Sequence, residues 1–438
     1  MTSWTQRAED HFRLKDLGTD WKTEALAGAT TFLTMSYIIF VNPSILGEAG
    51  IPPAAVAAAT CLSAAMGSLL MGVYARYPIA LAPGMGINAY FTYTVVIGMG
   101  IPWQAALGAV FLSGVLFLSL TLVGVQQAIV AAIPAGLYAA VGAGIGVFLA
   151  LIGLRTIGVI VPNEATMVSL GDFAEPDTLL GVFGLLLIST LMAWRVRAAI
   201  VIGIGVTTLA AALAGLVHWE NSGYGWSRMT AAAFQLDISP AIDLGFLEIV
   251  FVFWFVDLFD NVGTLMAVGK KAGLFSGRDR IPRVRRILLA DGAASTAGAL
   301  LGTSTVVSYI ESAAGVAAGG RSGLTAAVTG LLFLLALFIT PLVGVVPAAA
   351  TAPALIVVGC LMMSTVREID WDDMMIAIPA FLTILTIPLS YSIANGLAIG
   401  FVSFTLLKVC RGEFRSVSWL VYVLTLLFIL RFVYLGGH

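Results

Sequence analysis

Charged residues are scarce in this sequence. Asp, Glu, Lys and Arg make up 11% of its 438 residues, whereas a soluble domain carries about 25%. No charged residue occurs among the 78 residues between Arg76 and Arg155, or among the 45 between Arg321 and Arg367. One membrane crossing takes roughly 20 apolar residues, so each stretch must hold successive crossings joined by short turns. The sequence therefore predicts an all-α polytopic membrane protein.

Cysteine and histidine are too few and too scattered for a disulfide framework or a metal centre, and we expect neither a metal nor another cofactor. The net charge of −2 provides no basic face for nucleic acid. The N-terminal segment is polar through Glu24 and lacks the short apolar core of a cleaved signal peptide. The residues concerned are Cys61, Cys360, Cys410, His11, His218 and His438.

Apolar runs between proline, glycine and charged breaks predict twelve full spans. In the first half they are 25–46, 53–75, 103–125, 133–154, 177–194 and 198–217. In the second half they are 245–268, 284–302, 324–345, 347–364, 374–391 and 393–409.

Two further segments, 87–99 and 305–318, are apolar but too short to cross a membrane alone. Each follows an extended stretch rich in Gly and Pro or in Ser and Thr, which makes about fourteen membrane elements in total. A last apolar segment, 416–433, is interrupted by Arg431. It can either cross the membrane or lie at its surface, and the sequence does not decide between these.

Basic residues predict the orientation. They cluster in the N-terminal segment, between Lys270 and Arg286, and after the fourteenth element. If all fourteen elements cross, the three clusters fall on one side of the membrane. Because Lys and Arg accumulate in cytoplasmic loops, we expect a multi-pass protein of the cell (inner) membrane with a cytoplasmic N-terminus.

The two halves of the chain resemble each other. The short element is the third in each half, and Pro134 opens the fifth element as Pro347 opens the twelfth. Seven elements per half place the second half upside down relative to the first. Inverted repeats with matching broken elements are typical of transporters, whose site lies where the breaks meet. The alternative is an irregular bundle that happens to contain two short helices.

Acidic residues inside spans are costly and are therefore candidates for function. Asp257, Asp260, Asn261 and Thr264 recur at helical spacing in span 245–268 and form one polar face. This face must contact protein or a water-filled cavity. A purely structural role, such as pairing with another helix, is the alternative, and it carries more weight for Asp257. Glu248 stands near the start of the span, and we expect it at the interface.

The second acid is Glu311, in the short element 305–318. Hydroxyl residues surround it, among them Thr305 and Ser308, and hydroxyls can satisfy backbone groups freed at a helix break. In the first-half counterpart, Asn88 is the polar side chain, and Gly86 allows a ligand to approach the backbone. We expect these residues to meet in one site.

Carboxylates accept hydrogen bonds, an amide both donates and accepts, and aromatic rings such as Phe259 provide flat faces. This combination suits a planar heterocycle with ring N–H donors better than a sugar or an anion. Burial disfavours the charged form of a carboxylate, so one acid of the pair can take up and release a proton. Proton coupling is the favoured prediction, and Na⁺ coordination is the alternative.

At these residues the sequence resembles the AzgA-like purine permeases, a branch of the nucleobase–ascorbate transporter superfamily. The resemblance covers essentially the whole chain, and the motifs occur in the family's order. The matching stretches are Met35–Ser44, Ala82–Tyr93, Asp257–Leu265 and Thr303–Val316.

The resemblance implies proton-coupled symport of adenine, guanine or hypoxanthine, short strands opening the third and tenth elements, and a homodimer formed through the gate domain. It places the family's acids on Asp260 and Glu311 and its amide on Asn88. The predicted substrate site adds a phenylalanine, two hydroxyl residues and a glycine to these three residues. It consists of Gly86, Asn88, Phe259, Asp260, Thr305, Ser308 and Glu311. The implied divisions are an N-terminal cytoplasmic segment (1–24), a core domain (25–125 and 245–345), a gate domain (126–244 and 346–409) and a C-terminal segment (410–438).

Two other classes compete with a purine symporter. A membrane-embedded enzyme could use Asp260 and Glu311 as an aspartyl-type pair, but the chain lacks a Gly-x-Gly-Asp-type loop, and we expect no enzyme. An anion exchanger of the same architecture would need a positive or amide-rich site where this chain places carboxylates.

Overall fold

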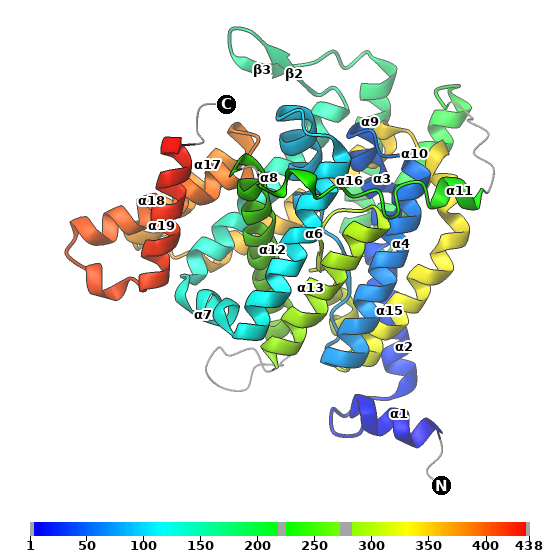
Figure 1. Cartoon of the computed structure of the whole chain (residues 1–438). Helices are drawn as coiled ribbons and strands as arrows, with labels where there is room; N and C mark the ends of the chain where they lie inside the picture. The colour runs from blue at the N-terminus through cyan, green and yellow to red at the C-terminus, as the bar shows by residue number, and fades with distance from the viewer. Residues whose placement is uncertain (1–3, 218–224, 243, 272–282, 435–438) are drawn as a thin grey trace.

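The computed structural model describes residues 4–217, 225–242, 244–271 and 283–434. Helices dominate, and in this part of the chain eight helical stretches are long and apolar enough to cross a membrane. The prediction of a polytopic α-helical protein is confirmed, and all fourteen predicted elements are present (Figure 1). The basic loop predicted between Lys270 and Arg286 lies largely outside the described residues.

The first seven elements correspond to helices or broken helices. The first element is split into two helices at Ser36 and Tyr37, and the second ends in a π-helical turn, Leu70–Ala75. The third begins with a strand and continues from a short α-helix into a π-helix, Tyr90–Gly98. The elements are α2 (Trp21–Met35), α3 (Ile38–Glu48), α4 (Pro53–Leu69), β1 (Leu81–Pro83), α5 (Met85–Ala89), α6 (Trp103–Val123), α8 (Ala135–Thr156), α9 (Pro176–Ala193) and α10 (Ala199–Leu213).

The second seven elements have the same order of helices and helix breaks. The tenth element again begins with a strand and continues into a short helix. The eleventh and twelfth elements end in 3₁₀ turns, Leu337–Val345 and Met363–Glu368. The elements are α12 (Leu244–Lys271), α13 (Val284–Leu301), β4 (Val306–Ser308), α14 (Ser312–Ala317), α15 (Gly323–Ala336), α16 (Ala348–Met362), α17 (Met374–Leu389) and α18 (Ile393–Cys410).

Several elements were not predicted. A β-hairpin connects the fifth and sixth elements, α8 and α9, and lies at the opposite end of the molecule from the N-terminal helix (Figure 1). The segment 416–433, which the sequence left unplaced, is a helix packed beside α18. These elements are α1 (Trp4–Phe12), α7 (Val125–Ala132), β2 (Ile160–Asn163), β3 (Met167–Leu170), α11 (Trp226–Met229) and α19 (Trp419–Tyr434).

The two helix breaks meet in the interior. β1 pairs with β4 antiparallel, with Leu81 opposite Ser308 and Pro83 opposite Val306. Proline lacks the N–H needed inside a helix, and Gly302 takes a positive φ of 96° that ends α13 before β4. The backbone groups freed at both breaks therefore pair with each other, as burial in an apolar setting requires.

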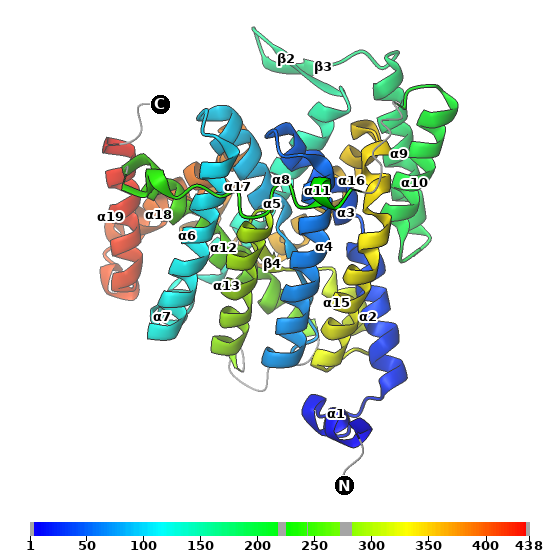
Figure 2. The same cartoon turned by 45° about the vertical axis from the view of Figure 1, so that its right-hand side comes forward.

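The helices pack in two groups. One group combines α4, α6, α13 and α15 with α2, and the other combines α8 with α16, α17 and α18. In the two views of Figures 1 and 2 the first group lies beside the second, and α12 lies between them, contacting both α6 and α8. The paired strands lie where the groups face each other.

Candidate functional site

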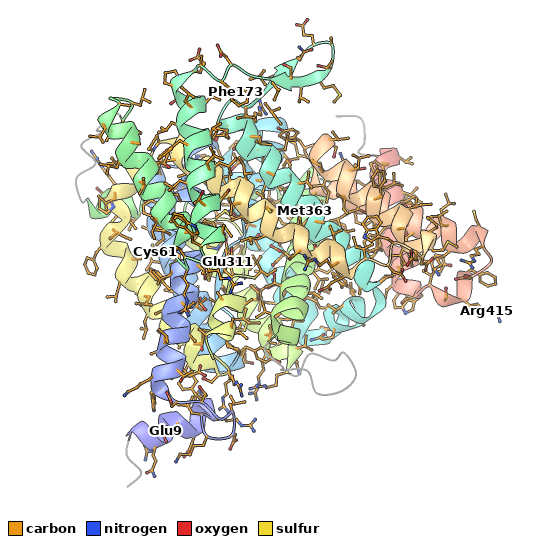
Figure 3. All side chains as sticks on the ribbon, turned by 180° about the vertical axis from the view of Figure 1, so that it is seen from behind. Glu9, Cys61, Phe173, Glu311, Met363 and Arg415 are labelled. Carbon is orange, nitrogen blue, oxygen red and sulfur yellow. The ribbon has the colours of Figure 1, made fainter. Side chains whose placement is uncertain are left out.

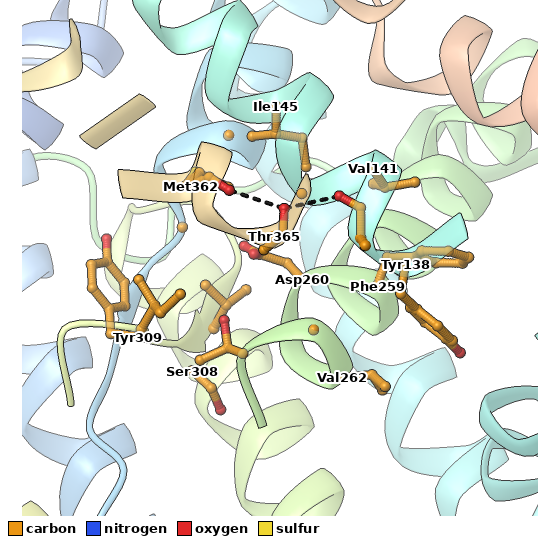
Figure 4. Close-up of a pocket in the computed structure, with 18 of the residues that line it drawn as sticks. Tyr138, Val141, Ile145, Phe259, Asp260, Val262, Ser308, Tyr309, Met362 and Thr365 are labelled. Carbon is orange, nitrogen blue, oxygen red and sulfur yellow. Dashed lines mark hydrogen bonds between the residues drawn. The ribbon is translucent and has the colours of Figure 1, made fainter. Parts of the chain in front are cut away.

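A cavity of about 500 Å³ lies between the two groups of helices (Figure 4). The strand β4, the start of α5 and the middle of α12 form one wall, and α8 and the end of α16 form the other. Its lining includes Tyr37, Gly84, Met85, Gly86, Gln127, Tyr138, Ile145, Phe259, Asp260, Val284, Ser308, Tyr309, Glu311, Met362, Thr365 and Glu368.

Asp260 and Glu311 both line this cavity. Glu311 lies between Glu9 at one end of the molecule and Phe173 at the other (Figure 3). The Tyr37 hydroxyl donates a hydrogen bond to Glu311 Oε1 at 2.7 Å. Among the described residues the lining contains no Lys, Arg or His, so the acids there accept hydrogen bonds without a neutralising cation from this part of the chain.

The strand pair places backbone and hydroxyl groups beside the acids. Ser308 ends β4 in the lining, and its hydroxyl is buried without a hydrogen-bond partner among the described residues. Gly84 donates its N–H to Thr305 O at 2.9 Å. A Cβ on Gly84 would lie 2.8 Å from Val307 Cγ2, so only glycine lets the chain pass this close to β4.

Aromatic rings flank the acids. Phe259 on α12 and Tyr138 on α8 have ring centroids 4.5 Å apart with planes inclined at 35°. Tyr309 lies on the other side of Asp260 in Figure 4, and its hydroxyl donates to Pro83 O. The rings of Tyr138, Phe259 and Tyr309 therefore offer apolar faces around a polar centre, an arrangement that suits a flat, polar-edged molecule.

A buried cluster of two carboxylates and one amide lies outside the cavity lining and supports the site. Asn261 Nδ2 donates to Asp257 Oδ1 at 2.8 Å and to Asp291 Oδ2 at 2.6 Å. Asn261 Oδ1 accepts the Ser308 N–H at 2.9 Å. Asp257, Asn261 and Asp291 are fully buried and absent from the lining, so this cluster fixes β4 against α12 and α13.

Two of the seven predicted site residues lie elsewhere. Asn88 donates to Asn42 and accepts from the Ser304 hydroxyl inside a buried polar cluster. Thr305 is buried, and neither Asn88 nor Thr305 belongs to the lining. The structure brings together the other five residues, which are Gly86, Phe259, Asp260, Ser308 and Glu311.

Sequence reasoning assigned no role to Tyr37, Tyr138, Thr365 or Asp291. Tyr37 lies at the break between α2 and α3, a feature that the continuous span 25–46 concealed. Asp291 is an acid within the predicted span 284–302, and its position there was a usable signal. Thr365 donates to the carbonyls of Ala139 and Met362 (Figure 4), and no periodicity indicated that contact.

The cavity extends from the acids toward one end of the bundle. Its lining reaches Gln127 in α7, Val284 at the start of α13 and Glu368 after α16. The N-terminal segment lies at the same end, because His11 contacts Val73 O near the end of the second element. In the part of the chain that the structure describes, no group of three or more His, Cys, Asp or Glu side chains could hold a metal ion.

Comparison with known proteins places this architecture among membrane permeases. A family model described as the permease family matches residues 22–399. The protein MJ0326 of Methanocaldococcus jannaschii is 52% identical over 430 residues, covering 98% of this chain and 99% of that protein. The adenine permease AdeP of Escherichia coli is 43% identical, covering 100% and 98%. The guanine/hypoxanthine permease PbuG of Bacillus subtilis is 45% identical, covering 97% and 99%.

Among solved structures, the transmembrane domain of the cyanobacterial bicarbonate transporter BicA shares the fold. Its TM-score is 0.65 at 16% identity, over 86% of this chain and 97% of that one.

Proposed function

The chain belongs to the permease family, of the nucleobase–ascorbate transporter type, and from this premise we propose that it carries purine nucleobases across the membrane by proton symport. The relatives AdeP and PbuG are named for adenine and for guanine and hypoxanthine. These purines are neutral, planar and rich in N–H donors.

The observation that carries the proposal is the pair of acids facing one cavity without a cation. Asp260 and Glu311 accept hydrogen bonds from ring or exocyclic N–H groups, and the rings of Tyr138 and Phe259, which pack on each other, offer an apolar face beside the purine. An anion exchanger of the same fold would need positive charge at this point, and the lining residues that the structure describes include no cation. The broken third and tenth elements would have no role in an aspartyl-type enzyme.

Proton coupling follows from the same charge arrangement. Two carboxylates that line one cavity without a cation among its described lining residues repel each other when both are charged, so one proton enters with the substrate. A neutral purine brings no charge, and the proton supplies one. Moving that charge through 100 mV provides about 2.3 kcal/mol, which supports roughly a fifty-fold gradient before any pH difference is added.

Alternating access in this proposal is a movement between the two groups of helices. The group around α4, α13 and α15, together with α12, is the core that carries Asp260 and Glu311. The group around α8, α16 and α17 is the gate. With a cytoplasmic N-terminus, the cavity described here opens to the cytoplasm. We also propose a homodimer formed through the gate, in the cell (inner) membrane.

Uptake of labelled hypoxanthine into cells lacking their own purine permeases tests the proposal. Unlabelled adenine, guanine and hypoxanthine are the competitors expected to reduce uptake, while uracil is expected to have little effect. Competition by uracil equal to that by the purines would contradict the purine assignment. Uptake of bicarbonate in place of hypoxanthine would favour the anion exchanger.

A further inference from the structure

The C-terminal helix α19 lies beyond residues 22–399, the part matched by the family model, and outside the fourteen-element repeat. In Figures 1 and 2 it stands at the edge of the molecule beside α18. Its Phe428 is 1% exposed. The Phe428 ring centroid lies 5.5 Å from that of Phe255 on α12 and 5.7 Å from that of Phe401 on α18. The helix α19 therefore covers the place where α12 and α18 adjoin.

Arg431 connects the same two helices through polar contacts. Its Nε donates to Glu248 Oε1 on α12, and its Nη1 donates to Asn395 Oδ1 on α18 at 2.9 Å. The side chains of Arg431 and Glu248 are only 16% and 14% exposed. Glu248 is thus covered by α19 and paired, and removal of Arg431 would leave a largely buried carboxylate without a counter-charge.

The two partners of Arg431 belong to different bodies. The helix α12 carries Asp260 and packs on α6, whereas α18 packs on α17, α19 and α8. We propose that Arg431 is a positioning residue for transport, which fixes the core relative to the gate in this conformation and releases Glu248 when the core moves. This inference rests on the proposed two-body transport.

The packing of α19 decides which contact is released. The helix α19 packs on α18, and the hydroxyls of Thr405 and Thr425 also join these two helices. Arg431 and α19 therefore travel with α18, and Glu248 is the partner released. The bond to Asn395 keeps the guanidinium in place beside α18. Arginine suits this role because its fork reaches two acceptors at once, whereas lysine presents a single point charge.

Variants separate the two contacts. Glu248→Gln removes the charge pair between the gate and the core, and Arg431→Lys keeps the charge beside Glu248 but loses the fork. Thr425→Val is the matched control on α19, because the Thr425 hydroxyl bonds with that of Thr405 on α18 at 2.7 Å and this contact lies within the gate.

Distance measurement between two spin labels reports the core–gate arrangement directly. The labels replace Leu122 at the end of α6 and Met374 at the start of α17, both exposed, in a background with Cys360 and Cys410 changed to Ser. Protein in lipid nanodiscs without substrate is compared across the variants. We expect Glu248→Gln and Arg431→Lys to populate a second core–gate distance about tenfold more, relative to the wild-type distance, as loss of a hydrogen bond between charged groups implies. Thr425→Val should leave the ratio unchanged.

Unchanged ratios in Glu248→Gln or in Arg431→Lys would overturn the positioning role. An equal shift in Thr425→Val would also overturn it, since packing of α19 would then suffice. The measurement needs no substrate, so its failure is distinguishable from that of the proposed function. A wild-type protein that moves no purine would contradict the transport assignment, whatever the distances show.

Discussion

Gly86 lets α5 approach α8 across the cavity, and this contact gives a sharp test of the two-body architecture. A Cβ at Gly86 would lie 2.3 Å from Ile145 Cγ2, whereas ordinary contacts begin at 3.4 Å. In Gly86→Ala, either Ile145 leaves its rotamer or α5 moves away from α8. Overpacking of this kind costs about 1–3 kcal/mol, which changes a conformational equilibrium about 5- to 150-fold. We therefore expect the initial rate of hypoxanthine uptake to fall about fivefold or more.

The assay compares initial uptake rates at equal amounts of protein in the membrane. Gly263→Ala is the control, because Gly263 also lines the cavity but its Cβ would meet nothing within 4 Å. Adding Ile145→Ala removes the methyl group with which the new Cβ would clash. The initial uptake rate of the double variant should therefore come within about twofold of the rate of Ile145→Ala alone. Wild-type uptake in Gly86→Ala, or a double variant no better than Gly86→Ala, would refute the reasoning.

Three further predictions concern the acids, the buried cluster and the orientation. Asp260→Asn and Glu311→Gln keep size but remove charge and the exchangeable proton, so both should abolish accumulation at near-normal expression; accumulation at the wild-type level in either variant would contradict the two-acid site. Asn261→Ala leaves the Ser308 N–H and two buried carboxylates unpaired and should lower the free energy of unfolding by about 3 kcal/mol or more. The melting temperature of this variant should therefore be lower than that of Thr264→Ala, which retains the cluster. Cysteines placed between residues 272 and 282 should react with impermeant reagents from the cytoplasmic side only, and labelling from outside would reverse the orientation.

The sequence predicted the elements well because each depends on local composition. Span lengths follow from apolar runs, and the short third and tenth elements follow from proline, glycine and hydroxyl breaks. The β2–β3 hairpin was missed because its eight strand residues form too short a pattern between two strong spans. The helix α19 could be recognised as apolar, but its placement depends on Arg431 meeting Glu248 and Asn395, which lie far away in the sequence.

Within the site, the direction in which a side chain points was harder to predict than the helix or strand to which its residue belongs. Successive residues of a helix turn by about 100°, so Asn88 points roughly opposite to Gly86 and enters a different polar cluster. Thr305 lies one residue before β4 and outside the lining, whereas Ser308 at the end of β4 belongs to it. Along α12, Asp257 and Asp260 share a broad polar face. Only the position of α13 decides that Asp257 is linked to Asp291 through Asn261 while Asp260 lines the cavity.

The central claim is that purine accumulation is driven by protons, and purified protein in liposomes tests it most directly. Hypoxanthine entry is followed with an inward proton gradient and potential, with a protonophore, and with Na⁺ replaced by choline. The two acids without a neighbouring cation predict accumulation that rises as external pH falls, collapses with the protonophore and is indifferent to choline. Accumulation that requires Na⁺ and survives the protonophore would contradict the account.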